Sequence, residues 1–118
     1  SDATVSRTLA LVASLNQAGE RNLVVLFGVM KDKDYAGMLK DLAPVTKYLI
    51  PVRPATPRAL QVSFLRRSAR EAGIRVLGGG TVAAGLREAQ RRRIPGETLL
   101  VTGSHYVVGE ALRALSAP

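Results

Sequence analysis

The chain of 118 residues carries a net charge of +8, from 17 Lys and Arg against nine Asp and Glu. Its length predicts one domain over residues 1–118, and a 47% hydrophobic content without Trp predicts an aliphatic core. The absence of cysteine excludes disulfides, thiolate catalysis and cysteine-based zinc sites. No apolar run approaches the ~18 residues of a membrane span and no signal peptide is visible, so we expect a cytoplasmic protein without a membrane partner.

The first predicted element is a helix near the start of the chain. Apolar residues recur with helical spacing between positions 5 and 15, Asp2 or Thr4 can cap the first turn, and Gly19 supplies the end. An α/β unit normally places a strand before such a helix, and we expect that strand to be missing here.

A buried strand and an acidic corner follow. Residues 23–29, LVVLFGV, are apolar except for one glycine, which predicts a strand buried on both faces inside the sheet. The run 31–34, KDKD, then leads into a helix with an apolar stripe over residues 35–42. Asp32 and Asp34 could hold a metal or a substrate group, or cap the helix and pair with the lysines. Two carboxylates without a third ligand favour capping.

The next strand and its corner are rich in proline. Residues 47–52 predict a strand, and Pro51 places it at an edge of the sheet or at its own end. Thr56 is the expected cap of the following helix, with Pro57 at the first helical position. Leu60 and Phe64 are expected to belong to the buried stripe of this helix, which ends at position 71.

Arginines gather on this corner and on two helix surfaces. Arg53 and Arg58 could clamp a carboxylate or phosphate, although surface corners often carry arginine. Two further groups are expected on solvated helix faces: Arg66, Arg67 and Arg70, and then Arg87, Arg91, Arg92 and Arg93. The net charge therefore indicates either an anionic partner, such as a nucleotide, an acidic substrate or nucleic acid, or an ordinary basic surface.

A glycine-rich turn separates the third strand from its helix. Residues 74–77 predict a short strand, residues 78–80 are glycines, and Thr81 is the expected cap of the next helix. The segment lacks the Lys-Ser/Thr of a P-loop and is not a G-x-G-x-x-G sequence, so we interpret it as a flexible turn.

The last strand is predicted over residues 99–101, as the central strand of the sheet, and Ser104 is the natural cap of the final helix. Ser104 and His105 are neighbours on a helix and do not face each other, so nucleophilic catalysis is not expected. A lone histidine makes no metal site. The residues expected to face the core are Val108, Ala111, Leu112 and Leu115.

Helices and strands thus alternate along the whole chain. This order requires right-handed crossovers and predicts an α/β fold: a Rossmann-like three-layer sandwich with a mostly parallel sheet covered on both faces.

Three stretches carry a resemblance to a known family: VLFGVMKDKDYAGMLKDLAP at 25–44, RPATPRAL at 53–60 and LVTGSHYVVGE at 100–110. In this order they resemble the C-terminal domain of the folylpolyglutamate synthase and dihydrofolate synthase family, which belongs with the Mur ligases. The resemblance implies a glutamate ligase domain of an ATP-dependent enzyme. Such an enzyme activates a folate carboxylate as an acyl phosphate and lets the amine of glutamate displace phosphate.

The resemblance also implies what this chain lacks. In the family, the P-loop and the magnesium ligands lie in a larger N-terminal domain, so ATP and Mg²⁺ belong to the full-length enzyme and none is expected to bind this chain tightly. The expected partners are that N-terminal ATPase domain, folate or dihydropteroate, and L-glutamate. The family's DGAHNP motif should precede the first helix, and Ser1-Asp2-Ala3 does not match it. We therefore assign no catalytic residue and expect the chain alone to be inactive.

The resemblance assigns substrate-facing roles to three corners. The candidates for contact with glutamate or nucleotide are Lys33, Asp34, Arg53, Arg58, Ser104, His105 and Tyr106. Ser104 is the best candidate for the incoming glutamate, whereas the family often has a hydrophobic residue where His105 stands. Two alternatives remain: a basic module that binds nucleic acid or another polyanion, and a Mur-type domain acting on a cell-wall precursor. We do not expect nucleic acid to be a partner of this chain.

Overall fold

The computed structural model describes residues 22–116, and the predicted first helix lies outside them. Four parallel strands form one sheet in the order β3-β2-β1-β4. The elements in chain order are β1 Leu23–Phe27, α2 Tyr35–Leu42, a short 3-10 helix η1 Ala43–Val45, β2 Thr46–Arg53, α3 Val62–Glu71, β3 Gly80–Thr81, α4 Val82–Arg92, β4 Thr98–Thr102 and α5 His105–Ser116.

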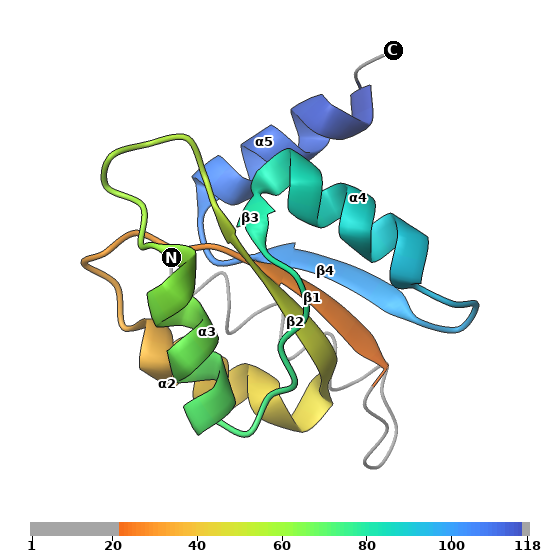
Figure 1. The fold of residues 1–118 in the computed structure, drawn as a ribbon, viewed down its shortest axis with the longest axis horizontal. Coiled ribbons are helices and arrows are strands. Elements are labelled where there is room, and N and C mark those ends of the chain that lie inside the picture. Colours follow the sequence, from red (N-terminus) through yellow and green to blue (C-terminus); the bar gives the residue numbers. More distant parts are fainter. Residues whose placement is uncertain (1–21, 117–118) are drawn as a thin grey trace.

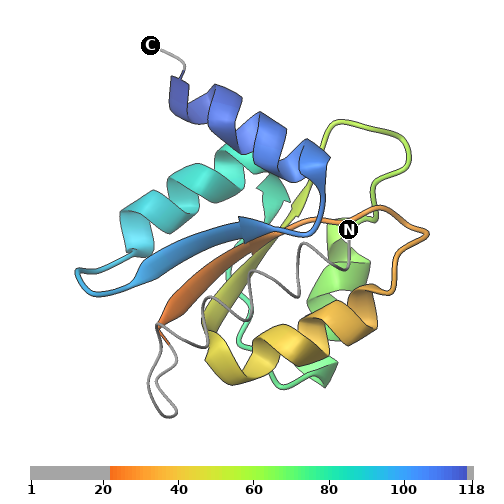
Figure 2. The same ribbon diagram turned by 180° about the vertical axis from the view of Figure 1, so that it is seen from behind.

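Helices cover both faces of this sheet. In Figures 1 and 2, α2 and α3 lie on one face, and α4 and α5 lie on the other. The side chains of β1 alternate between the two layers: Val25 and Phe27 pack toward α2 and α3, and Val24 and Leu26 pack toward α4 and α5. All five residues of β1 are buried, which confirms the predicted interior strand and the three-layer α/β fold. Within residues 22–116, no helix is long and apolar enough to cross a membrane.

Of the two positions that Pro51 predicts for the second strand, the edge of the sheet is wrong, because β2 lies between β3 and β1. Pro51 does lie near the end of β2, two residues before Arg53. The backbone of Leu49 faces the β3 side: its N–H donates to Arg75 O at 2.8 Å and its carbonyl accepts from Leu77 N at 3.0 Å. Backbone groups two residues apart in a strand face the same side, so the nitrogen of Pro51 also faces the β3 side. At this point β2 has no hydrogen-bonding neighbour, because Pro51 lies between the bridge at Leu49 and the two-residue ladder with β3. An interior strand therefore tolerates proline where its neighbour is interrupted.

The predicted strand over residues 74–77 is also wrong. Only Val76 forms a bridge to β2, and the ladder resumes at β3. Residues 78–80 are glycines with φ between 61° and 145°, which turn the chain away from β2 and back. A Cβ on Gly79 would lie 3.0 Å from the carbonyl oxygen of Pro51, so the turn passes close to β2.

The third helix begins later than the sequence indicates. Thr56 and Pro57 lie in a turn before α3, which starts at Val62 without a side-chain cap. Between them, Ala59 forms an antiparallel bridge with Met30. This pairing across two corners holds the chain extended where local propensity favours a helix start.

Burial along α3 follows the prediction only in part. Leu65 and Ala69 are buried as expected, and Leu60 is buried outside the helix. Phe64 is 47% exposed, and the guanidinium of Arg67 lies 6.0 Å from the centroid of its ring. The expected inward position of Phe64 is therefore wrong.

The last strand is not central. Among the described residues, β4 pairs with β1 alone and lies at the edge of the sheet. In helix α5, Val107 and Ala111 are buried in the core. The residues Val108, Leu112 and Leu115 are 37%, 59% and 56% exposed. Of the four residues expected to face the core, Ala111 alone is buried, because the stripe of α5 that packs on the core consists of Val107, Ala111 and Ala114.

An ion pair stabilises the edge of the sheet where the strands begin. Glu97 is buried, its Oε2 accepts from Lys47 Nζ, and its Oε1 accepts from the backbone N–H of Ile94 at 2.9 Å. The hydrogen bond with Lys47, followed by that from Ile94, lowers the pKa of the Glu97 carboxyl below its ordinary value.

A Glu97→Gln variant is expected to lose stability in a pH-dependent way. Because the pKa of Glu97 is lower in the folded chain, its stabilisation is present above the unfolded value of about 4.3 and is lost as the pH falls through the folded pKa. The difference in unfolding free energy between parent and variant should shrink between about pH 7 and pH 3. Urea unfolding measures it, with the exposed Glu71→Gln as the control. A difference that does not change with pH would contradict this assignment.

Candidate functional site

The candidate residues gather at the end of the sheet that is formed by the carboxyl ends of the parallel strands. Lys33 and Asp34 follow β1, Arg53 ends β2 and Arg58 follows it, and Ser104 begins the turn after β4. His105 and Tyr106 form the first turn of α5. In open parallel sheets, ligands bind beyond the carboxyl ends of the strands. This end of the sheet is therefore the candidate functional site.

The corner after β1 is organised by a helix cap. The Asp34 side chain accepts a hydrogen bond from Gly37 N at 3.1 Å, which confirms the capping interpretation. Asp32 pairs with Arg58 at 3.9 Å rather than with a flanking lysine, and both side chains are largely exposed. No group of three His, Cys, Asp or Glu residues that could hold a metal occurs within residues 22–116.

An Asp34→Ala variant is expected to lose about 1 kcal/mol of unfolding free energy, because the Gly37 N–H loses its acceptor. Chemical denaturation measures this loss. Asp41→Ala, which removes an exposed carboxylate from the same helix, is the matched control and should have a smaller effect. Equal losses in the two variants would contradict the capping role.

The corner after β2 is tied to its neighbours on both sides. Lys31 N donates to the carbonyl of Arg58 at 2.9 Å, which joins it to the β1 corner. On the other side, Ala55 N donates to Glu110 Oε1 at 2.8 Å, which joins it to α5. The structure does not bring Arg53 and Arg58 into one clamp: Arg53 lines a large groove, whereas Arg58 lines a separate pocket of about 300 Å³ beside Asp32.

The turn after β4 is tight and presents Ser104. Gly103 has a φ of 113° and passes directly against the backbone of Gly28. The Ser104 hydroxyl oxygen accepts from Val107 N at 3.2 Å, which confirms the predicted cap of α5. A capping hydroxyl that accepts in this way keeps its own proton to donate to a ligand. His105 and Tyr106 are both exposed.

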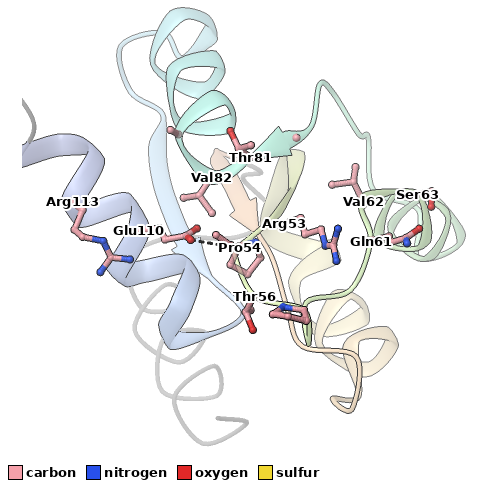
Figure 3. Close-up of a pocket in the computed structure, with 14 residues that line it drawn as sticks. Arg53, Pro54, Thr56, Gln61, Val62, Ser63, Thr81, Val82, Glu110 and Arg113 are labelled. Carbon is pink, nitrogen blue, oxygen red and sulfur yellow. Dashed lines mark hydrogen bonds between the residues drawn. The ribbon is translucent and has the colours of Figure 1, made fainter.

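A groove of about 1150 Å³ opens beside these corners, between the segment after β2, the start of α4, and α5 (Figure 3). Its polar walls include residues that sequence reasoning did not assign to the site: Thr56, Gln61, Ser63, Thr81, Glu110 and Arg113. Thr81 was visible in the sequence only as a helix cap, and its hydroxyl does accept from Ala84 N at 3.1 Å. No sequence motif indicated that side chains of α5 would lie beside the segment that follows β2.

Four of the other arginines make polar contacts within the fold. Arg91 and Arg92 both pair with Glu88, and the hydrogen bond from Arg92 lowers the pKa of that carboxyl. Arg93 donates to the carbonyl of Glu97 at 3.0 Å, and Arg66 donates to that of Gly78 at 2.8 Å. These bonds favour the interpretation of a solvated helix surface over a free nucleic-acid interface.

Comparison with known proteins gives consistent matches. The family described as Mur ligase, glutamate ligase domain, matches residues 3–105. Folylpolyglutamate synthase of Lacticaseibacillus casei is 33% identical over 110 residues, which are 89% of this chain and 23% of that protein. E. coli FolC, solved in complex with DHPP and ADP, is 20% identical with a TM-score of 0.82, over 95% of this chain and 26% of that chain.

A further solved relative extends the comparison to a third organism. Folylpolyglutamate synthase of Mycobacterium tuberculosis, solved in complexes with ADP and AMPPCP, is 26% identical with a TM-score of 0.66. The match covers 97% of this chain and 28% of that one. The chain therefore spans about a quarter of the length of the relatives it matches.

Proposed function

Because the chain belongs to the Mur ligase family through its glutamate ligase domain, we propose that it is the C-terminal domain of an ATP-dependent folate:L-glutamate ligase. Residues 1–118 would form this domain, and an N-terminal ATPase domain of the same cytoplasmic polypeptide would be its partner. Folate or dihydropteroate and L-glutamate would be the substrates, as the names of the similar proteins suggest.

One observation carries the proposal: the three stretches that resemble the folate ligases place their polar residues at the same end of the sheet. They lie far apart in sequence and meet only through the parallel topology. Backbone hydrogen bonds link the first two corners, and the close approach of Gly103 to Gly28 links the first to the last. These links support the proposal that this end of the sheet forms one surface, which would close over another domain.

The roles of this chain would be binding and closure. ATP, held with Mg²⁺ by the other domain, would supply the phosphoryl group that activates the acceptor carboxylate. Here, the Ser104 hydroxyl would donate a hydrogen bond to a carboxylate of the incoming glutamate, and Arg53 would attract the negative charge of this substrate. Lys33, Asp34 and Arg58, with His105 and Tyr106, would line the closing face. Closure would orient the amine and exclude water from the activated carboxylate.

The acceptor specificity of the intact protein tests this proposal. With ATP, Mg²⁺ and L-glutamate, mass spectrometry should detect a glutamate adduct of a folate or of dihydropteroate. Reactions from which Mg²⁺ or L-glutamate is omitted are the controls, and they should give no adduct. An adduct with a cell-wall precursor and none with folate would reject the proposal in favour of the Mur-type alternative.

A further inference from the structure

The groove in Figure 3 has a cationic side chain at each side. Arg53, from the end of β2, and Arg113, from α5, both line it, and in this view Pro54, Val82 and the carboxylate of Glu110 lie between them. Within residues 22–116, neither arginine forms an ion pair. Two guanidinium groups without a carboxylate partner therefore face one groove.

The two walls are held at a fixed separation. Arg53 is anchored through its backbone, because it pairs with Thr81 in the ladder between β2 and β3. The wall that carries Arg113 is joined to the same corner by the hydrogen bond from Ala55 N to Glu110 Oε1 at 2.8 Å. The backbone positions that carry the guanidinium groups are thus set before a ligand arrives, which reduces the entropic cost of binding.

Glu110 also constrains the charge distribution of a ligand. Its carboxylate lines the groove one helical turn before Arg113 and disfavours negative charge near it. Anionic groups of a ligand are therefore best placed at the two arginines, with an uncharged segment against the proline and the valine. The volume of about 1150 Å³ lies just above the range of about 300–1,000 Å³ that is typical of small-molecule sites, so the groove has room for an extended ligand.

We infer that this groove binds an extended small organic anion that carries one anionic group at each end, held by Arg53 and Arg113. Carboxylates and phosphates share this chemistry, since both accept two hydrogen bonds from one guanidinium. The inference shares Arg53 with the proposed contact to glutamate and goes beyond that contact, because it assigns Arg113 a role in a groove that does not include the Ser104 turn. Binding here also requires no transfer reaction.

Direct binding to the full chain tests the inference without a ligase assay. Isothermal titration with the α,ω-dicarboxylates glutarate and suberate, and with 1,6-hexanediol bisphosphate, should show saturable binding of at least one probe. Octanoate, which has a single carboxylate, should bind about tenfold more weakly than suberate. The comparison of suberate with the bisphosphate distinguishes carboxylate from phosphate recognition.

Three substitutions make the test specific. Arg53→Gln and Arg113→Gln should each weaken the best probe about tenfold, whereas Arg87→Gln, on the exposed face of α4, should have no effect. Glu110→Gln keeps the acceptor for Ala55 N and removes the negative charge, so it should tighten binding about threefold. Circular dichroism checks that each variant is folded.

Several outcomes would overturn the inference. They are the absence of binding by every probe at millimolar concentration, equal affinity for suberate and octanoate, and loss of binding in only one of the two arginine variants. Weaker binding by a folded Glu110→Gln variant would also contradict it. None of these results depends on whether the intact protein is a folate ligase, so the two proposals fail independently.

Discussion

A Gly103→Ala variant is expected to lose about 3 to 5 kcal/mol of unfolding free energy, the sum of backbone strain and overpacking. A Cβ at this position would lie 2.0 Å from the carbonyl oxygen of Gly28 and 2.9 Å from its carbonyl carbon. Both atoms belong to the backbone of the β1 corner, so no side-chain rotation relieves the contact. The φ of 113° adds strain for any residue with a Cβ.

Gly96→Ala is the matched control for this prediction. Gly96 has a similar φ of 92°, but a Cβ there would meet no atom within 4 Å. Its expected loss is therefore about 1 kcal/mol, from the backbone conformation alone. Urea denaturation of both variants measures the difference, and equal losses would contradict the close contact between the two corners.

If the proposed function is right, a Ser104→Asp variant of the intact protein is expected to raise the KM for glutamate about tenfold to hundredfold with little change in stability. Aspartate caps helices as well as serine does, so Val107 N keeps its acceptor and the unfolding free energy should change by less than about 0.5 kcal/mol. The added carboxylate repels an anionic substrate and cannot donate a hydrogen bond. Steady-state kinetics at varied glutamate measures the effect.

Two further variants separate the charge from the cap. Ser104→Ala loses the cap, which costs about 1 kcal/mol of stability, and also the proposed donor to the substrate. Gln90→Glu adds a negative charge on the exposed side of α4, away from this end of the sheet, and should leave the KM unchanged. If Ser104→Asp leaves the KM for glutamate at the parent value in an active enzyme, Ser104 does not contact that substrate.

Features with a local cause could be predicted from the sequence. The continuous apolar run identified β1, and the capping residues Asp34, Thr81 and Ser104 each accept the expected backbone hydrogen bond. A cap depends on a few neighbouring residues, but its signal fails where a distant contact overrides it, as at Thr56, since α3 starts only at Val62. The resemblance drawn from the three motifs is also confirmed, by the family match over residues 3–105.

Features set by contacts between distant segments could not be predicted. The bridge between Met30 and Ala59 delays the start of α3, and the position of β4 at the sheet edge depends on which strand it pairs with. The groove has the same origin. Glu110 and the Ala55 amide are 55 residues apart, and only the packing of α5 on the sheet brings them together.

The most direct test of the account is the ATP-dependent transfer of radiolabelled glutamate to a folate acceptor, measured for the intact protein and for the 118-residue chain alone. The account predicts labelled folylglutamate from the intact protein and none from the chain alone, because this chain supplies only the closing face. Labelled product from the purified chain alone would contradict this division of roles. An intact protein that hydrolyses ATP without labelling any folate acceptor would contradict the proposed function itself.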